Sequence, residues 1–179
     1  MAIVRGGPDG APLAWAPCRS GHLCPPSGRL ALLVPALGLA KVSHDGWPHI
    51  DGLLRMHSHD QSGVMRGLRE RHNELLGGHG NDTIIGGRKG DVIWGDYKPS
   101  GQPTTQVDRL YGRGGRDFIY ASHGLNYVFT GAGRDIVHAH FGRGEIHCGS
   151  SDVVVYISHR SRPRYHLVGC RRVSYRPDG

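Results

Sequence analysis

The chain lacks any apolar run of the roughly 18 residues that a membrane-spanning helix needs. It also lacks the short motifs of common catalytic sites, because neither G-x-S-x-G nor H-E-x-x-H nor a phosphate-binding loop occurs among its 179 residues. Its four cysteines include no C-x-x-C pair, which argues against a zinc ribbon or a thioredoxin-type site. These absences favour a protein that is not an enzyme, and they give no reason to expect a transmembrane segment.

Glycine is the residue in excess, with 29 among the 179 positions, more than twice the usual share of about 7%. No G-x-y triplet persists, which excludes a collagen helix. Aliphatic residues recur between the glycines, which argues against a disordered low-complexity segment. The remaining explanation is a repeat that is rich in turns.

An aliphatic residue recurs every nine positions through the middle of the chain. Stepping by nine from Leu75 leads to Ile84 and Ile93, and the step of nine resumes after one interruption. The eight positions of this aliphatic column are Leu75, Ile84, Ile93, Leu110, Ile119, Val128, Val137 and Ile146. The period predicts short strands that each point one aliphatic side chain inward and are joined by turns.

A second column, of polar residues, lies two positions before the aliphatic one. Its members are Asn73, Asp82, Asp91, Asp108, Asp117, Asn126, Asp135 and Gly144. Glycines cluster just upstream, where they supply the positive φ angles of a tight turn without steric cost. Two units should make one coil of about 18 residues, and successive coils should stack as parallel strands about 4.8 Å apart.

Residues 77–85 (GGHGNDTII) match the nonapeptide pattern G-G-x-G-x-D-x-U-x in full, and residues 86–94 and 112–138 match it in part. In these motifs the chain resembles the hemolysin-type (RTX) calcium-binding repeat family, over about half of its length. The resemblance implies an all-β fold, a parallel β-roll or β-solenoid of nine-residue repeats with two repeats per coil. It also implies Ca²⁺ sites between the turns of successive coils, with carboxylate and carbonyl oxygens as ligands.

The site residues that the resemblance implies are Gly78, Gly80, Asn81, Asp82, Gly87, Asp91, Asp108, Gly114, Asp117, Gly133 and Asp135. Asp117 and Asp135 are 18 positions apart and should flank one site. Asp91 and Asp108, 17 apart across the interruption, are the pair expected at another.

Other features point to few and weak sites. The partner position of Asp82 is expected near Ser100, inside an irregular loop, so that its site should be incomplete. Arg116 and Arg134 directly precede two of the aspartates, and a neighbouring cation lowers the attraction for Ca²⁺. The alternative is that the Asp and Asn side chains only shape the turns.

The repeat divides the chain into three regions. Residues 1–67 are expected to be irregular, residues 68–155 to form the roll, and residues 156–179 to form a C-terminal cap with a closing hairpin. A loop at 95–107, which contains two prolines, leaves the roll. This loop is either a recognition element or a tolerated insertion.

Cysteine placement and one apolar run favour a secreted, extracellular protein. Cys148 and Cys170 bracket the expected hairpin and should form a disulfide, with free buried thiols as the alternative. The segment 30–40 (LALLVPALGLA) resembles the apolar core and cleavage site of a secretory signal, and the alternative is a short buried segment. Cys18 and Cys24 either pair or are removed with such a leader.

The net charge of +7 lies in the flanks of the repeat. Residues 73–152 hold nine acidic and eight basic residues, whereas residues 1–72 hold five and eight and residues 153–179 hold one and six. The basic flanks are either a solvated surface or a contact with a cell surface or anionic polymer, and no motif for specific nucleic-acid binding accompanies them.

The expected function is therefore a calcium-binding β-roll module, structural or adhesive, with calcium ions as its cofactor and partner. Histidines such as His138 and His140 are expected to be surface residues, because no familiar ligand spacing completes a transition-metal site. The alternatives are a solenoid enzyme that acts on acidic polysaccharide and a basic surface binder of anionic polymers.

Overall fold

The computed structural model describes residues 16–17, 23–24, 46–56, 61–97, 103–150 and 152–176. The chain divides into two compact units, Met1–Val42 and Ser43–Gly179. In the first unit, β1 (Ala16–Pro17) and β2 (Leu23–Cys24) pair in antiparallel orientation. The expected secretory signal at 30–40 and the pairing of Cys18 with Cys24 fall outside the described residues.

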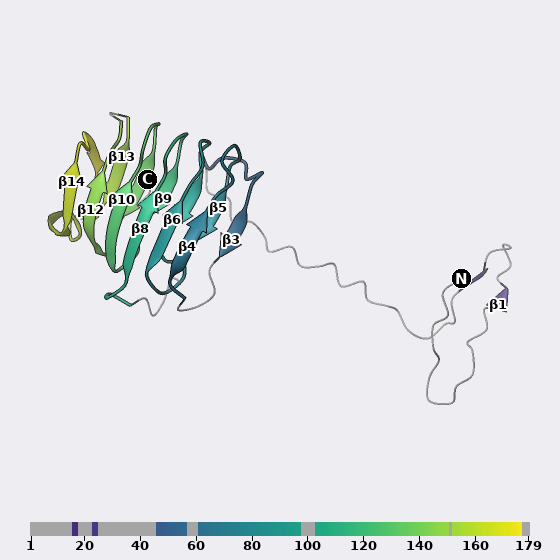
Figure 1. Cartoon of the computed structure of the whole chain (residues 1–179). Coiled ribbons are helices and arrows are strands. Elements are labelled where there is room, and N and C mark those ends of the chain that lie inside the picture. Colours follow the sequence, from purple (N-terminus) through teal and green to yellow (C-terminus); the bar gives the residue numbers. More distant parts are fainter. Residues whose placement is uncertain are drawn as a thin grey trace. The chain divides into compact units, whose positions relative to one another are not determined.

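The second unit is a parallel β-solenoid made of two sheets (Figure 1), which confirms the fold predicted from the repeat. The seven-stranded sheet contains β3 (Leu54–Met56), β5 (Glu74–Leu76), β7 (Val92–Trp94), β9 (Phe118–Tyr120), β11 (Ile136–Ala139), β13 (Val154–Ile157) and β15 (Arg172–Ser174). The six-stranded sheet contains β4 (Gly63–Arg66), β6 (Asp82–Ile85), β8 (Val107–Tyr111), β10 (Leu125–Phe129), β12 (Arg143–His147) and β14 (Tyr165–Val168). Consecutive strands alternate between the sheets, and a short 3-10 helix (Arg162–Arg164) precedes β14.

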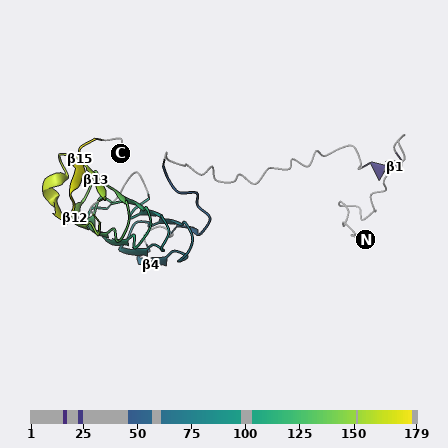
Figure 2. The same cartoon turned by 90° about the horizontal axis from the view of Figure 1, so that it is seen from above.

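The aliphatic column forms the seam between the two sheets. All eight of its members have an exposed fraction of 0%. Neighbouring coils align them in register, as Ile84 with Leu110 and Ile119 with Val137. Burying one such side chain stabilises the fold by about 1.5–3 kcal/mol. Seen from above, the coils follow one another from β4 at one end to β15 at the other (Figure 2).

The irregular loop is an insertion into a single coil. Ile84 aligns with Leu110, and Ile93 aligns with Ile119, so both sheets step by 26 residues here. The following coils step by 18, as from Ile119 to Val137. The segment between β7 and β8 is therefore one nine-residue unit that carries eight additional residues, of which 98–102 lie outside the described part.

The solenoid extends beyond both ends that the repeat indicated. The predicted start at residue 68 is too late, because β3 and β4 form an earlier coil in which the buried Met65 aligns with Ile84. The predicted closing hairpin is wrong, because β13 and β14 belong to different sheets and run parallel to β11 and β12. Val155 aligns with Val137, so the inward column continues where the glycines and aspartates have ended.

The predicted disulfide between Cys148 and Cys170 is confirmed, with the two Cα atoms 5.0 Å apart. Cys148 follows β12 and Cys170 follows β14, which are adjacent strands of the six-stranded sheet. The bond therefore joins the turns of two successive coils.

Candidate metal centre

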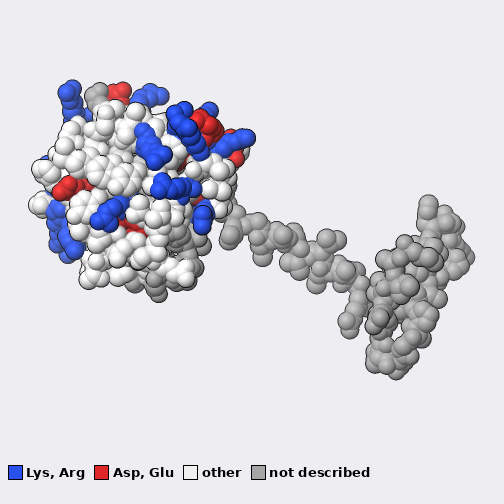
Figure 3. Space-filling model, viewed as in Figure 1, with Lys and Arg blue, Asp and Glu red and all other residues white. Residues whose placement is uncertain are grey.

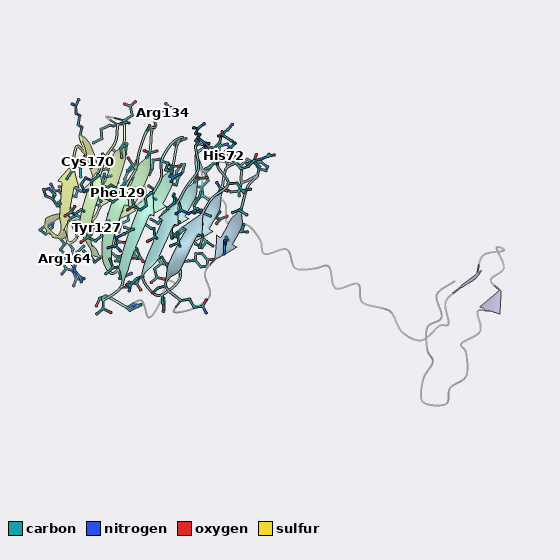
Figure 4. All side chains as sticks on the ribbon, in the orientation of Figure 1. His72, Tyr127, Phe129, Arg134, Arg164 and Cys170 are labelled. Carbon is teal, nitrogen blue, oxygen red and sulfur yellow. A yellow bond between two sulfur atoms is a disulfide. The ribbon has the colours of Figure 1, made fainter. Side chains whose placement is uncertain are left out.

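The turns stack along two edges of the solenoid. At the first edge the chain passes from the seven-stranded to the six-stranded sheet, and at the second edge it returns. Figure 4 labels His72 and Arg134 at the second edge, near the top of the view, and Arg164 at the first edge, near the bottom. The predicted residues divide into Gly78, Gly80, Asn81, Asp82 and Asp108 at the first edge, and Gly87, Asp91, Gly114, Asp117, Gly133 and Asp135 at the second.

A ladder of buried side chains runs along the second edge. The backbone N–H of Asn73 donates to Oδ1 of Asp91 at 2.6 Å, and that of Asp91 donates to Oδ1 of Asp117 at 2.7 Å. The backbone N–H of Asp117 donates to Oδ1 of Asp135 at 3.0 Å. The Oδ1 atom of each carboxylate thus accepts a hydrogen bond that joins its coil to the preceding one. Asp117 and Asp135 therefore lie in adjacent turns of the same edge, and that they flank one Ca²⁺ site stays a prediction.

Two other pairings expected from the sequence are wrong. Asp91 neighbours Asp117 across the insertion and does not pair with Asp108, which lies at the other edge. The neighbour of Asp82 is Asp108 and not a residue of the irregular loop, since the backbone N–H of Asp82 donates to Oδ1 of Asp108 at 3.0 Å. Both errors have one cause: the 17-residue step from Ile93 to Leu110 was taken as nearly two units, whereas it is one unit with eight inserted residues, which places Asp108 at the first edge.

In two turns the protein itself satisfies the second carboxylate oxygen. Oδ2 of Asp82 accepts the backbone N–H of Gly78 at 3.1 Å, and Oδ2 of Asp91 accepts that of Gly87 at 2.6 Å. In each case the donor lies four residues before the aspartate. We call these closed turns, since the upstream amide donates to the second carboxylate oxygen.

The first edge contains further bonds of this kind. The hydroxyl of Ser122 donates to Oδ2 of Asp108 at 2.5 Å. Oδ1 of Asn81 accepts the backbone N–H of Val107 at 2.7 Å and so ties one turn to the next. The carboxylate and amide oxygens at this edge are therefore engaged within the protein.

The turns of Asp117 and Asp135 differ from the closed turns. Oδ2 of each is buried and accepts no hydrogen bond among the described residues. Four positions earlier the backbone has positive φ, 75° at Arg113 and 84° at Gly131, whereas Gly78 and Gly87 are not in that region. We call these open turns, since the backbone N–H four residues before the aspartate does not donate to its carboxylate.

Glycines bring the backbone of the open turns close to oxygen atoms, as Gly77 and Gly86 do in the closed turns. A Cβ atom added to Gly112 would collide with Oδ2 of Asp117 and with the carbonyl oxygen of Thr130. A Cβ added to Gly133 would collide with the carbonyl oxygen of Gly115. Carboxylate and carbonyl oxygens are the hard donors that Ca²⁺ takes. No three His, Cys, Asp or Glu side chains gather around one point in the described ranges, so such a site depends on carbonyl oxygens as well.

Burial disfavours the charged form of these carboxylates. It raises the pKa of Asp117 to about 8 and that of Asp135 to about 6. At the first edge it raises the pKa of Asp108 to about 7. A bound cation favours ionised carboxylates, so the residues present fit a divalent cation at the open turns.

The rim of the second edge is basic. Arg113, Arg116 and Arg134 are exposed there, and Lys and Arg side chains gather along the upper margin in Figure 3. The guanidinium of Arg116 lies over the ring of Phe118, 5.1 Å from its centroid. Positive charge at this rim opposes the approach of Ca²⁺, so we still expect weak sites.

Sequence reasoning missed a stack of aromatic rings on the outer face of the seven-stranded sheet. Trp94 and Tyr120 have ring centroids 3.9 Å apart, Tyr120 and His138 4.6 Å, and His138 and Tyr156 5.4 Å. The signal was present, since each of these residues directly follows an inward aliphatic residue. The stack was not predicted, because the nine-residue period was defined by aliphatic and acidic residues only.

Part of the chain matches a protein-family model. The model of the RTX calcium-binding nonapeptide repeat matches residues 73–97 and 104–137, with four copies. The comparisons with curated proteins and with solved structures gave no match. In the described part of the chain, no helix has the length and apolar character needed to cross a membrane.

Proposed function

We propose that this chain, whose residues 73–97 and 104–137 match the model of the RTX calcium-binding nonapeptide repeat, is a β-roll module whose principal Ca²⁺ ion is held by Asp117 and Asp135. The observation that supports this position is the pair of buried Oδ2 atoms without hydrogen-bond donors. The carbonyl oxygen of Thr130 would add a further ligand. Bound Ca²⁺ supplies the positive charge that buried carboxylates need, and it links the turns of successive coils.

The other predicted residues follow from this proposal. Gly114 and Gly133 belong to the open turns that carry Asp117 and Asp135. Secondary sites would involve Gly78, Gly80, Asn81, Asp82, Gly87, Asp91 and Asp108. An ion there competes with the amide and hydroxyl donors that already bond the carboxylates. Occupancy of these positions should therefore need higher calcium concentrations.

We further propose that the module is secreted or surface-associated and has a structural or adhesive role. A disulfide such as Cys148–Cys170 persists in oxidising compartments. The fixed period of the aspartates accounts for them without a catalytic task. An ion that binds only the folded roll stabilises it by about 1.4 kcal/mol for each tenfold excess over its dissociation constant, which suits a module that works where calcium is abundant.

Calorimetric titration of the full chain with Ca²⁺ tests the position of the ion. Asp117→Asn and Asp135→Asn keep the Oδ1 acceptor of the ladder and remove the charge. Each should weaken the tightest site by at least about tenfold, as expected for loss of a charged ligand. The control Glu70→Gln removes an exposed charge from the same edge and should leave the site unchanged. Absence of calcium-dependent heat, or equal affinity in all variants, would refute the proposal.

A further inference from the structure

A cavity of about 710 Å³ lies on the outer side of the seven-stranded sheet, where β7, β9 and β11 run into the first-edge turns. Its lining includes the stacked rings of Trp94, Tyr120 and His138 and the more exposed rings of Tyr97 and Phe141. The volume lies within the range of about 300–1,000 Å³ that is usual for small-molecule sites. The cavity is separate from the open turns of Asp117 and Asp135, which lie at the second edge.

Two nitrogen atoms of the lining residues have no hydrogen-bond partner. Nε1 of Trp94 and Nε2 of His140 are both buried and unbonded among the described residues. Leaving a buried polar atom unpaired destabilises the fold. The indole N–H can only donate, so it requires an acceptor. Burial lowers the pKa of His140, and a neutral imidazole nitrogen donates or accepts according to its tautomer.

The charges of the described lining residues favour a neutral ligand. Among these residues the lining contains no Lys or Arg. The carboxylate among the described lining residues is that of Asp96, which accepts a hydrogen bond from Nε2 of Gln106 at 2.9 Å and lies 3.8 Å from Nε2 of His79. An anion would find no Lys or Arg among the described lining residues, and a cation would find a carboxylate that is already engaged. The complementary ligand is neutral.

From these features we propose that the cavity binds a neutral sugar, as a monosaccharide or the end of a glycan. Sugar hydroxyls both donate and accept hydrogen bonds, so different hydroxyls of one ring can bond the indole N–H of Trp94 and the imidazole of His140. The apolar face of a pyranose ring packs against aromatic rings, and Tyr97 and Phe141 offer exposed rings, with 45% and 55% of their surface accessible. A purely apolar ligand would leave both nitrogen atoms unpaired.

Saturation-transfer NMR and calorimetry on the calcium-loaded full chain test this assignment. The probes are methyl glycosides of glucose, galactose and mannose, methyl N-acetylglucosaminide, and a hydrophobic dye that carries no sugar. At least one glycoside should bind and change the fluorescence of the chain's tryptophans. Binding of the dye alone, or of no glycoside at millimolar concentration, overturns the proposal.

Variants locate the binding. Phe141→Ala should weaken glycoside binding by about tenfold, the effect of one aromatic contact. Tyr175→Ala is the matched control, because both residues are exposed rings stacked on a histidine, Phe141 on His123 and Tyr175 on His159. Trp94→Phe keeps a ring in the stack but removes the N–H, and it should also weaken binding. Equal affinity in Phe141→Ala and Tyr175→Ala would place the sugar elsewhere.

Discussion

At the residue scale, aspartates at the same position of the repeat have different tasks. The difference lies in the backbone four residues upstream, where the closed turns present an amide to the carboxylate and the open turns do not. Arg113 adopts a φ of 75° at the place that Gly131 takes one coil later. A left-handed conformation costs a non-glycine residue about 1–2 kcal/mol. The chain tolerates this cost at the turn where Oδ2 of Asp117 is left for another ligand.

Substitution by alanine should have different effects on stability at two glycines of the Asp117 turn. Gly112→Ala places a methyl group against Oδ2 of Asp117 and the carbonyl oxygen of Thr130, which should destabilise the roll by about 1–3 kcal/mol and remove the principal calcium site. Gly114→Ala meets no atom closer than 3.6 Å and should change the stability by less than about 1 kcal/mol. Urea unfolding with and without Ca²⁺ measures both effects. An equal gain in stability from Ca²⁺ in the two variants would contradict the proposed position of the ion.

At the element scale, the nine-residue period was enough to predict the strands and the interior. All eight aliphatic positions are buried, because inward alternation and stacking leave no other place for them. The insertion was not predictable in the same way. A step of 17 from Ile93 to Leu110 reads either as two shortened units or as one lengthened unit. The sheet to which β8 belongs decides between these two interpretations. It also determines at which edge of the solenoid each later turn lies.

The two ends of the solenoid were hidden for a different reason. Glycine and aspartate mark turns, but the stacking of coils depends only on an inward apolar residue and on free strand edges. Met65 and Val155 meet that condition without the turn motif. The outer aromatic stack had a period as clear as the inner one, yet nothing in a β-roll requires rings at those positions, so only the structure revealed the cavity beside them.

The disulfide between successive coils leads to a prediction about one end of the solenoid. Replacing both Cys148 and Cys170 by serine removes a crosslink over a sequence separation of 22. In the chain-entropy model this should lower the free energy of unfolding by about 3 kcal/mol. Urea unfolding of the oxidised protein and the double variant gives the difference. A difference near zero would mean that the β12–β14 pairing is already stable without the bond.

At the scale of the whole molecule, each coil contacts only its neighbours, so stability is the sum of many small interfaces. An ion between two turns strengthens the interface between their two coils. It thereby stabilises the coils that unfold together with them. We therefore expect circular dichroism of the calcium-free chain to show a less ordered or less stable roll, which regains its signal when Ca²⁺ is added. A spectrum and melting curve unchanged by both chelator and calcium would contradict this coupling.

The buried carboxylates make both the stability of the calcium-free roll and its affinity for Ca²⁺ depend on pH. The two should change in opposite directions. Without calcium, the raised pKa values of Asp117 (about 8), Asp108 (about 7) and Asp135 (about 6) let the folded roll keep protons that the unfolded chain releases near pH 4. The melting temperature in chelator should therefore be highest at acidic pH and fall as the pH rises through 6 to 8. Calcium displaces those protons, so its affinity should increase over the same interval and offset the loss. Melting curves from pH 5 to 8.5, with chelator and with Ca²⁺, should separate as the pH rises. Curves in chelator that climb across this interval would mean that the carboxylates are ionised and already compensated within the protein.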